Sequence, residues 1–228
     1  ETLIFEAKMT APFLLRRSKS QVLSDLPEKD EKTIYSGMED EQRKLYLAAH
    51  KQLVDQLQGI DSAYYEKNKI FILSQLTKLR QICCHPALCY DDYQGSSAKL
   101  EACMELVQRA VKGKHKVLLF SQFTSMLDLI RERLAEQNTK YYCLTGNTDK
   151  QERQRLVDEF QNDDTPVFLI SLKAGGTGLN LTAADIVIHY DPWWNVAAQN
   201  QATDRAHRIG QKNTVTVYRL IAKDSLEE

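Results

Sequence analysis

The stretch QATDRAHRIGQ, residues 201–211, carries the residue types best suited to holding an anion. Gln201, Arg205 and Arg208 are spaced i, i+4 and i+7, so on a helix they share one face. A guanidinium is permanently charged and presents a planar fork of donors, as a phosphate group requires. Gly210 follows where a helix would end. The pattern therefore predicts phosphate recognition by two arginines on one helical face.

A salt-bridged surface is the second interpretation of this stretch, because Asp204 and Arg208 are also i, i+4 partners. The loop SLKAGGTGLNL, residues 171–181, favours the anion, since glycines let the backbone turn tightly and expose N–H groups. Its three glycines are Gly175, Gly176 and Gly178. A plain tight turn stays an alternative, because the loop is neither GxGxxG nor a Walker loop, and no GxxxxGK[ST] occurs in the chain.

The motif DPWW, residues 191–194, places two tryptophans after an apolar, strand-like segment. Adjacent side chains diverge, so we expect one of Trp193 and Trp194 to pack and the other to face solvent or a ligand. Half-buried packing is one interpretation. A stacking or wedging contact with nucleic acid is the other.

Four potential metal ligands, Cys83, Cys84, His85 and Cys89, lie close together, but they form no CxxC pair and no second ligand pair follows. We expect buried apolar cysteines at the end of a helix and no metal. The chain has five cysteines without a regular spacing, which indicates reduced thiols and an intracellular protein.

Strands that are apolar throughout alternate with helices after residue 98, which predicts a parallel sheet covered by helices on both faces. The expected strands are 116–120, 141–144, 167–171, 185–190 and 214–220. The expected helices are 98–112, 124–137, 149–160 and 196–209. Thr148 and Gln151 predict a capping box at the start of the third of these helices. Ligands of such sheets bind at the carboxyl ends of the strands, in the loops 121–124, 145–149, 172–182 and 191–196.

The first part of the chain is organised differently. Residues 1–37 combine a basic cluster with an acidic, proline-containing stretch, and we expect a linker or brace there, with a solvated charge run as the alternative. Residues 38–95 form a helical segment with helices at 39–58 and 64–84, and the polar stretch 91–97 marks a boundary. Residues 96–228 then form the α/β domain.

Composition limits the classes of protein. The chain has 228 residues, of which 43% are hydrophobic and 27% charged, as in ordinary globular proteins. No apolar run approaches the roughly 20 residues of a membrane span. The net charge is −1, so nucleic-acid binding would depend on local clusters of charge. The first residues, ETLIFEAKMT, resemble no secretory signal, and we expect the chain to be a piece of a longer protein.

Several motifs together resemble the second RecA-like lobe of Swi/Snf-type ATPases, the DNA-translocating motors of superfamily two. They are LLFSQFTSMLDLI (118–130), LTGNT with ERQRLVDEFQ (144–161), LISLKAGGTGLNLTAADIVIHYDPWWN (169–195) and QATDRAHRIGQ. PFLLRRSKSQVLSDLPEK (12–29) and LRQICCHPAL (79–88) resemble the same family's inter-lobe brace and helical protrusion. Val196 stands where many relatives have proline, and we expect this difference to adjust only the start of the helix. The compact protrusion favours a bacterial source.

The resemblance implies a role for each matching residue. Arg205 and Arg208 match arginine fingers that reach the ATP phosphates bound to the first lobe. ATP contacts are implied for Gly176, Gly178, Asn180 and Gln201. DNA contacts are implied for Ser121, Gln122, Thr145, Gly146, Lys173 and Trp194. Because fingers act only when two lobes close, hydrolysis would be tied to lobe motion.

The resemblance also implies what this chain lacks. The Walker lysine and the Mg²⁺-binding acidic box belong to the first lobe, and Asp40-Glu41 and Asp158-Glu159 lie in charged helical contexts instead. We therefore expect ATP and Mg²⁺ to be held mainly by the first lobe, and the chain alone to be inactive. The expected partners are that lobe, double-stranded DNA and DNA-bound protein, with no membrane. The expected location is the cytoplasm or nucleoid of a bacterium, or the nucleus of a eukaryote. Two alternatives are a catalytically silent interaction module and a strand-separating helicase.

Overall fold

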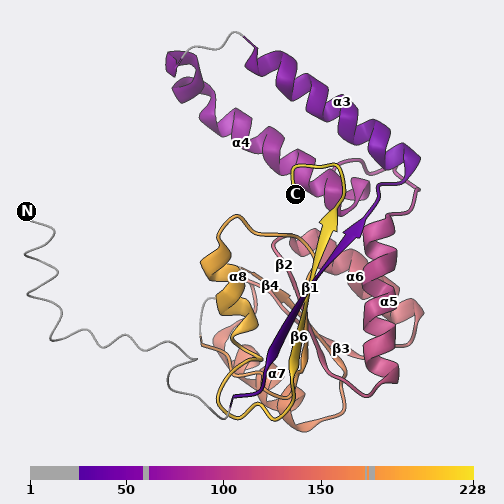
Figure 1. The fold of residues 1–228 in the computed structure, drawn as a ribbon, viewed down its shortest axis with the longest axis vertical. Helices are drawn as coiled ribbons and strands as arrows, with labels where there is room; N and C mark the ends of the chain where they lie inside the picture. The colour runs from indigo at the N-terminus through magenta and orange to yellow at the C-terminus, as the bar shows by residue number, and fades with distance from the viewer. Residues whose placement is uncertain (1–25, 59–61, 173, 175–177) are drawn as a thin grey trace, which may run out of the picture.

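The computed structural model describes residues 26–58, 62–172, 174 and 178–228. These residues form a parallel sheet with the strand order β1-β6-β5-β2-β4-β3. The strands are β1 (Lys29–Ser36), β2 (Val117–Ser121), β3 (Tyr141–Leu144), β4 (Val167–Ser171), β5 (Ile186–His189) and β6 (Val215–Ala222). Figure 1 shows this sheet below a pair of long helices. The expected α/β fold is confirmed, and it is the RecA-like fold.

Helices cover both faces of the sheet. They are α5 (Ala98–Lys112), α6 (Thr124–Glu136), α7 (Lys150–Asn162) and α8 (Val196–Thr203). Alternate side chains of the fully buried strand β2 enter two different cores. Leu119 packs in the core that α5 and α6 share, and Leu118 packs in the core formed with α7 and α8. The apolar strands thus bury both faces, as their composition predicted.

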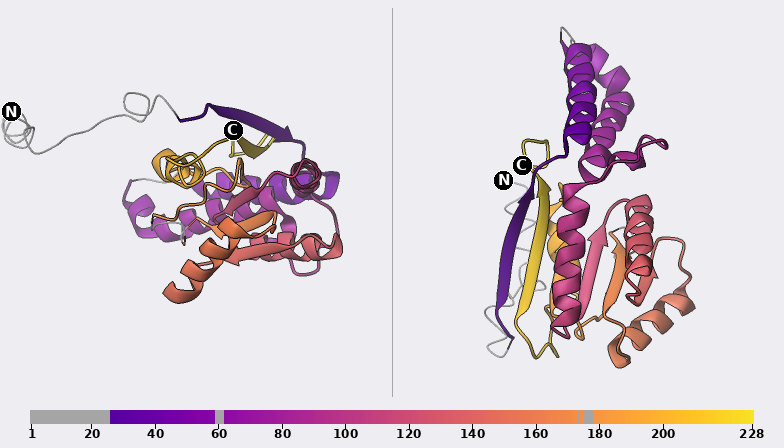
Figure 2. Two further views of the ribbon diagram at one scale, coloured as in Figure 1. Left: turned by 90° about the horizontal axis from the view of Figure 1, so that it is seen from below. Right: turned by 90° about the vertical axis from the view of Figure 1, so that its right-hand side faces the viewer.

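The strand β1 was not predicted, since its residues lie in the segment expected to be a linker or brace. It pairs with β6 in parallel, from Lys29 opposite Val215 to Ser36 opposite Ala222, and Figure 2 shows the two strands side by side. Most residues of β1, whose sequence is KDEKTIYS, are exposed to solvent. This is typical of a strand at the edge of a sheet, where charged side chains face water. The sheet therefore begins inside residues 1–37, and the domain limits at 37 and 95 stay predictions.

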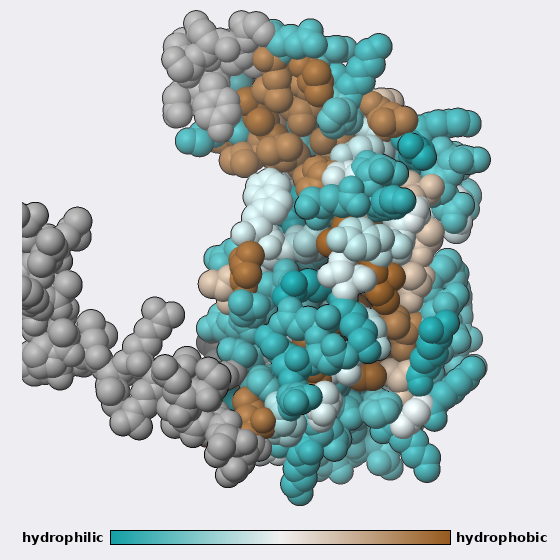
Figure 3. All heavy atoms as spheres, viewed as in Figure 1, coloured by the Kyte–Doolittle hydropathy of each residue, from teal (hydrophilic) through white to brown (hydrophobic). Residues whose placement is uncertain are grey.

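A hairpin of two helices, α3 (Asp40–Leu57) and α4 (Ser62–Cys84), extends beyond the end of the sheet (Figure 1). The short 3-10 helix η2 (Pro86–Leu88) follows α4. Gln42 is buried and donates to the carbonyl of Ile82 at 2.8 Å, which joins the bases of the two helices. Figure 3 shows apolar surface gathered over this hairpin. Its exposed apolar residues are Leu47, Val54, Leu57, Ile70, Phe71 and Leu73.

Two helix ends differ from the sequence-based expectation. Asp149, and not Thr148, caps α7, because the Asp149 carboxylate accepts from the backbone N–H groups of Gln151 and Glu152. The Thr148 hydroxyl instead accepts from the backbone N–H of Thr145. Helix α8 ends at Thr203 rather than near residue 209, and the chain continues as consecutive turns.

The cysteines at the end of α4 are buried, as expected. Cys83 and Cys84 have no exposed surface, and burial raises the pKa of the Cys83 thiol to about 12. Among the residues that the structure describes, no three of the types His, Cys, Asp and Glu gather as a metal site would require. No helix within these residues is both long enough and apolar enough to cross a bilayer.

Candidate phosphate and nucleic-acid site

The carboxyl ends of the central strands bring the predicted loops to one edge of the sheet. The backbone N–H of Leu172, after β4, donates to the carbonyl of Ser121 at the end of β2. The backbone N–H of Gln122 donates to the carboxylate of Asp191, which follows β5, at 3.2 Å. Asp191 is buried, and burial raises the pKa of its carboxyl against the hydrogen bonds from Ser121 and Gln122. The loops 121–124 and 191–196 are therefore held as one surface.

The three residues of the 201–211 stretch that were expected to share a face do lie together. Gln201, Arg205 and Arg208 line an open hollow of about 290 Å³ with Gly178, Leu179 and Asp204. They do so although α8 ends before Arg205, because the turns after Thr203 continue in the helical sense. Arg208 is exposed, whereas Arg205 is buried at 4% exposure. The hollow thus has one buried and one exposed guanidinium.

Backbone contacts fix the position of Arg205. Its carbonyl accepts from the backbone N–H of Leu181, at the end of the glycine-rich loop, at 3.0 Å. Burial lowers the pKa of the Arg205 guanidinium, and the nearby charges of Arg153 and Arg208 lower it further. Since two neighbouring positive charges disfavour the charged form of Arg205, an anion bound beside it would be stabilising.

The sequence predicts that Gly210 ends a helix, but the structure does not place it at a helix end. It has a φ of 102°, in the left-handed region that favours glycine, and lies in the turn between Arg208 and Gln211. Gln211 is the residue that locks this turn. Its side-chain amide donates to the carbonyls of Thr182, Ala184 and Ala206, and its Oε1 accepts from the backbone N–H groups of Lys212 and Asn213.

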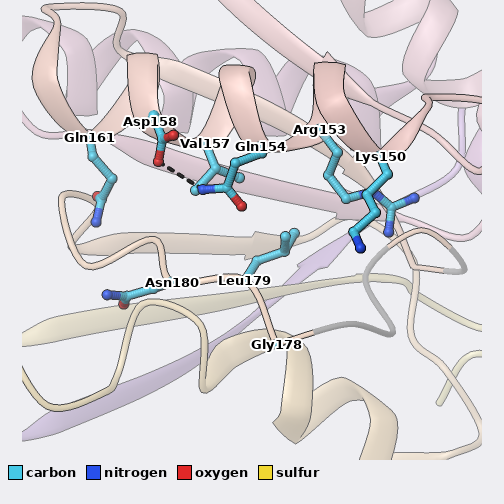
Figure 4. A pocket seen from close by; sticks show the side chains of 9 residues that line it. All are labelled: Lys150, Arg153, Gln154, Val157, Asp158, Gln161, Gly178, Leu179 and Asn180. Carbon is cyan, nitrogen blue, oxygen red and sulfur yellow. Dashed lines mark hydrogen bonds between the residues drawn. The ribbon is translucent and has the colours of Figure 1, made fainter.

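A second hollow of about 630 Å³ lies on the other side of the segment 178–180, along α7 (Figure 4). Figure 4 shows side chains of α7 facing Gly178, Leu179 and Asn180 across it. They are Lys150, Arg153, Gln154, Val157, Asp158 and Gln161. Arg153 donates from Nη1 to the carbonyl of Ala174 at 3.2 Å, within the glycine-rich loop. Sequence reasoning missed Arg153, since its partners are distant in the sequence.

The residues expected to contact DNA differ in exposure. Gly146 is open to solvent, with no atom near the position that a Cβ would take, and Thr145 is partly exposed beside it. Trp194 is 59% exposed, whereas Trp193 packs against the core shared with α7 and α8, so the two rings diverge as expected. Ser121 is fully buried, and its hydroxyl bonds with the backbone of Phe123. The predicted contact between Ser121 and DNA stays a prediction.

The remaining expected contacts stay predictions. Gln122 is partly exposed, Gly178 lines both hollows, and Asn180 lines the larger one. Lys173 and Gly176 lie outside the described residues. Among the charged side chains that line the two hollows, four are arginine or lysine and two are aspartate, which suits phosphate oxygens better than a divalent cation.

A parallel sheet covered by helices, with an arginine-lined hollow beside its glycine-rich loop, is the arrangement of the class of RecA-like helicase lobes. Two family models match the chain, one described as the SNF2-related domain over residues 7–88 and one as the helicase conserved C-terminal domain over residues 98–210. The C-terminal domain of the Sulfolobus solfataricus SWI2/SNF2 ATPase is 34% identical with a TM-score of 0.73, and the match covers 88% of this chain and 82% of that one. The chain belongs to the Swi/Snf-type family of superfamily-two ATPases.

Longer relatives match nearly the whole chain. The Sulfolobus solfataricus SWI2/SNF2 ATPase core in complex with dsDNA is 36% identical with a TM-score of 0.76, over 98% of this chain and 47% of that one. An uncharacterized ATP-dependent helicase of Mycoplasma pneumoniae is 43% identical over 96% of this chain and 21% of its own length. The ISWI chromatin-remodeling complex ATPase ISW1 of Saccharomyces cerevisiae is 36% identical over 95% of this chain. The chain spans about a fifth of the length of these two curated relatives.

Proposed function

We propose that this chain is the second motor lobe of a DNA-dependent ATPase that translocates on double-stranded DNA and remodels the protein bound to it. The observation that carries the proposal is the hollow in which Gln201, Arg205 and Arg208 face the end of the glycine-rich loop. The names of the relatives support it, since they include ATP-dependent helicases, a chromatin-remodeling ATPase and an ATPase core in complex with dsDNA.

Arg205 and Arg208 then act as arginine fingers on ATP held by a first lobe. A finger stabilises the charge on the transferred phosphoryl group and contributes roughly 10³–10⁵ in rate. Exposed Arg208 is able to cross between lobes, and buried Arg205 supports it from the chain's own core. Gly178, Asn180 and Gln201 contact nucleotide from this side, together with Gly176. Mg²⁺ and most of the ATP contacts belong to the first lobe, and the 228-residue chain alone does not turn over ATP.

DNA lies across the loops at the carboxyl ends of the strands. Backbone N–H groups at Gly146, the side chains of Thr145 and Gln122, and the ring of Trp194 suit contacts that do not depend on sequence. Lys173 adds a phosphate contact. Binding of this kind weakens steeply with salt. The protein works with its own first lobe and with DNA-bound protein, in a bacterial nucleoid or a eukaryotic nucleus.

The test is DNA-stimulated ATP hydrolysis by the full-length protein that carries this lobe. Arg208→Ala should lower turnover by about a thousandfold while DNA affinity is kept. Arg205→Ala should do the same. The matched control is Arg155→Ala, because Arg155 is an exposed arginine of α7 that pairs with Glu152 and Glu159, away from the hollow. Unchanged turnover in both finger variants would leave the arginines a structural role and overturn the finger mechanism. No DNA-stimulated turnover in the unchanged protein would favour a silent interaction module. A strand-displacement assay separates translocation from unwinding.

A further inference from the structure

Arg80 of α4 is a charged residue of the helical hairpin that reaches into the surface formed by the loops 121–124 and 191–196. Only 7% of it is exposed. Its Nη2 donates to the carbonyl of Pro192, a residue that lies 112 positions later in the chain. We propose that Arg80 is a positioning residue, which holds Trp194 in the orientation that meets DNA and couples the hairpin to both loops. The DNA part of this proposal rests on the proposed function.

The surroundings of Arg80 are aromatic. Its guanidinium carbon lies 5.0 Å from the centre of the Trp194 ring and 6.0 Å from that of Phe123. Among the residues that the structure describes, no carboxylate forms an ion pair with it. A buried cation without a carboxylate depends on carbonyl oxygens and ring faces for its stabilisation, and cation–π attraction is strongest where water is excluded. The two rings are therefore structural partners of the charge.

The partners of Arg80 belong to two different loops. Phe123 follows β2, and Pro192 and Trp194 follow β5, while the N–H of Gln122 and the carboxylate of Asp191 join the same two loops. Trp194 is the exposed member of this group, and its indole would be free to rotate without a partner on one face. Arg80 supplies that partner and so selects one orientation of the ring.

The end of α4 is fixed next to this cluster. The carbonyl of Cys84 accepts from the hydroxyl of Tyr190 at 2.9 Å and from that of Ser97 at 3.1 Å. Tyr190 is fully buried and follows β5 directly. Since Arg80 lies one helical turn before Cys84, α4 contacts the β5 end and its loop at two points. A displacement of the hairpin is thereby transmitted to Trp194.

The first test needs no DNA. The chain has two tryptophans, so a Trp193→Phe background reports on Trp194 alone. In that background Arg80→Gln should raise the quenching of fluorescence by acrylamide by about twofold, because the second face of the ring becomes open. Arg80→Lys, which keeps the charge, should restore part of the protection. Arg109→Gln removes an exposed guanidinium of α5 and should change nothing. Equal quenching in Arg80→Gln and the unchanged background would overturn the proposal, provided that circular dichroism shows both folded.

The second test is a double-mutant cycle on DNA affinity in the full-length protein. Arg80→Gln and Trp194→Ala should each weaken binding by about tenfold, and the double variant by little more than tenfold, because both remove the same oriented ring. A hundredfold loss in the double variant would mean that Arg80 acts independently of Trp194, against the proposal. If Trp194→Ala leaves DNA affinity unchanged while quenching responds to Arg80, the DNA contact fails and the positioning of the ring stands.

Discussion

The Nε2 atom of His189 lies 2.9 Å from the hydroxyl oxygen of Thr203, which joins the last residue of β5 to the last residue of α8. His189 is 1% exposed and stacks on Phe120. The contact fixes the end of α8 against the sheet, two residues before Arg205. The arginines are thus placed by a buried neutral imidazole as well as by the turns that carry them.

This imidazole should make stability depend on pH. Burial, with a smaller effect of Arg219, lowers the pKa of His189 to about 3, whereas an unfolded histidine has a pKa of about 6.5. Between these values the unfolded chain binds the extra proton, so stability should fall as pH falls from about 6.5 toward 3, by about 1.4 kcal/mol per unit. Urea unfolding at several pH values measures this slope. His189→Gln should reduce it, and His50→Gln, at an exposed site on α3, should not.

Lys99 and Glu227 form a buried ion pair, 2.6 Å between Nζ and Oε2, that ties α5 to the C-terminal segment. Although burial alone would lower the pKa of Lys99, the Glu227 carboxylate raises it. Lys99→Met should cost about 3–5 kcal/mol of unfolding free energy, because it leaves a buried carboxylate without its partner. Adding Glu227→Gln should recover part of this loss in urea unfolding. A double variant as unstable as the sum of the single ones would contradict the pairing.

Gln211 should contribute to stability and not only to the site. Its amide group makes five hydrogen bonds with the surrounding backbone, and the side chain is buried. Gln211→Ala should cost about 1–3 kcal/mol for each buried backbone group left without a partner and out of reach of water. Thermal unfolding gives the measurement. The control is Gln154→Ala, on the exposed face of α7. Equal midpoints of thermal unfolding in the two variants would mean that the hydrogen bonds of Gln211 do not stabilise the fold.

The arginine hollow should bind an anion without the rest of the motor. Inorganic pyrophosphate should raise the melting temperature of the chain by about 2–4 °C for each kcal/mol of binding free energy. Arg208→Ala should abolish most of that rise, since Arg208 is the exposed cation of the hollow. Arg155→Ala should keep it. The same rise in all three proteins would place the anion elsewhere on the surface.

Much of the fold could be predicted from the sequence because the central strands are apolar throughout. The segment 167–171 matches β4, and 98–112 matches α5. The edge strand β1 could not be predicted, because its exposed residues carry neither an apolar run nor an alternation. The early end of α8 was missed for a related reason. Its limit is set by contacts with the sheet, such as that of Thr203 with His189, and not by local propensity.

Within the site, spacing along the chain was informative only for residues on one segment. It brought Gln201, Arg205 and Arg208 together correctly. It could not find Arg153, whose partner Ala174 lies 21 positions away, or Arg80, whose partner lies 112 positions away. Nor could it show that Ser121, predicted to contact DNA, lies buried at the end of β2 with its hydroxyl bonded to the backbone of Phe123.

The pairing of β1 with β6 has a consequence for the order of folding. Glu31 of β1 pairs with Arg219 of β6, 188 positions later. Closing a loop of this length has a large entropic cost, so contacts among the intervening strands and helices are expected to form first. During synthesis β1 leaves the ribosome before the other described strands of this sheet, and β6 leaves after them. Of these strands, the earliest made is therefore among the last to be ordered, and β6 is an unpaired edge until β1 pairs with it.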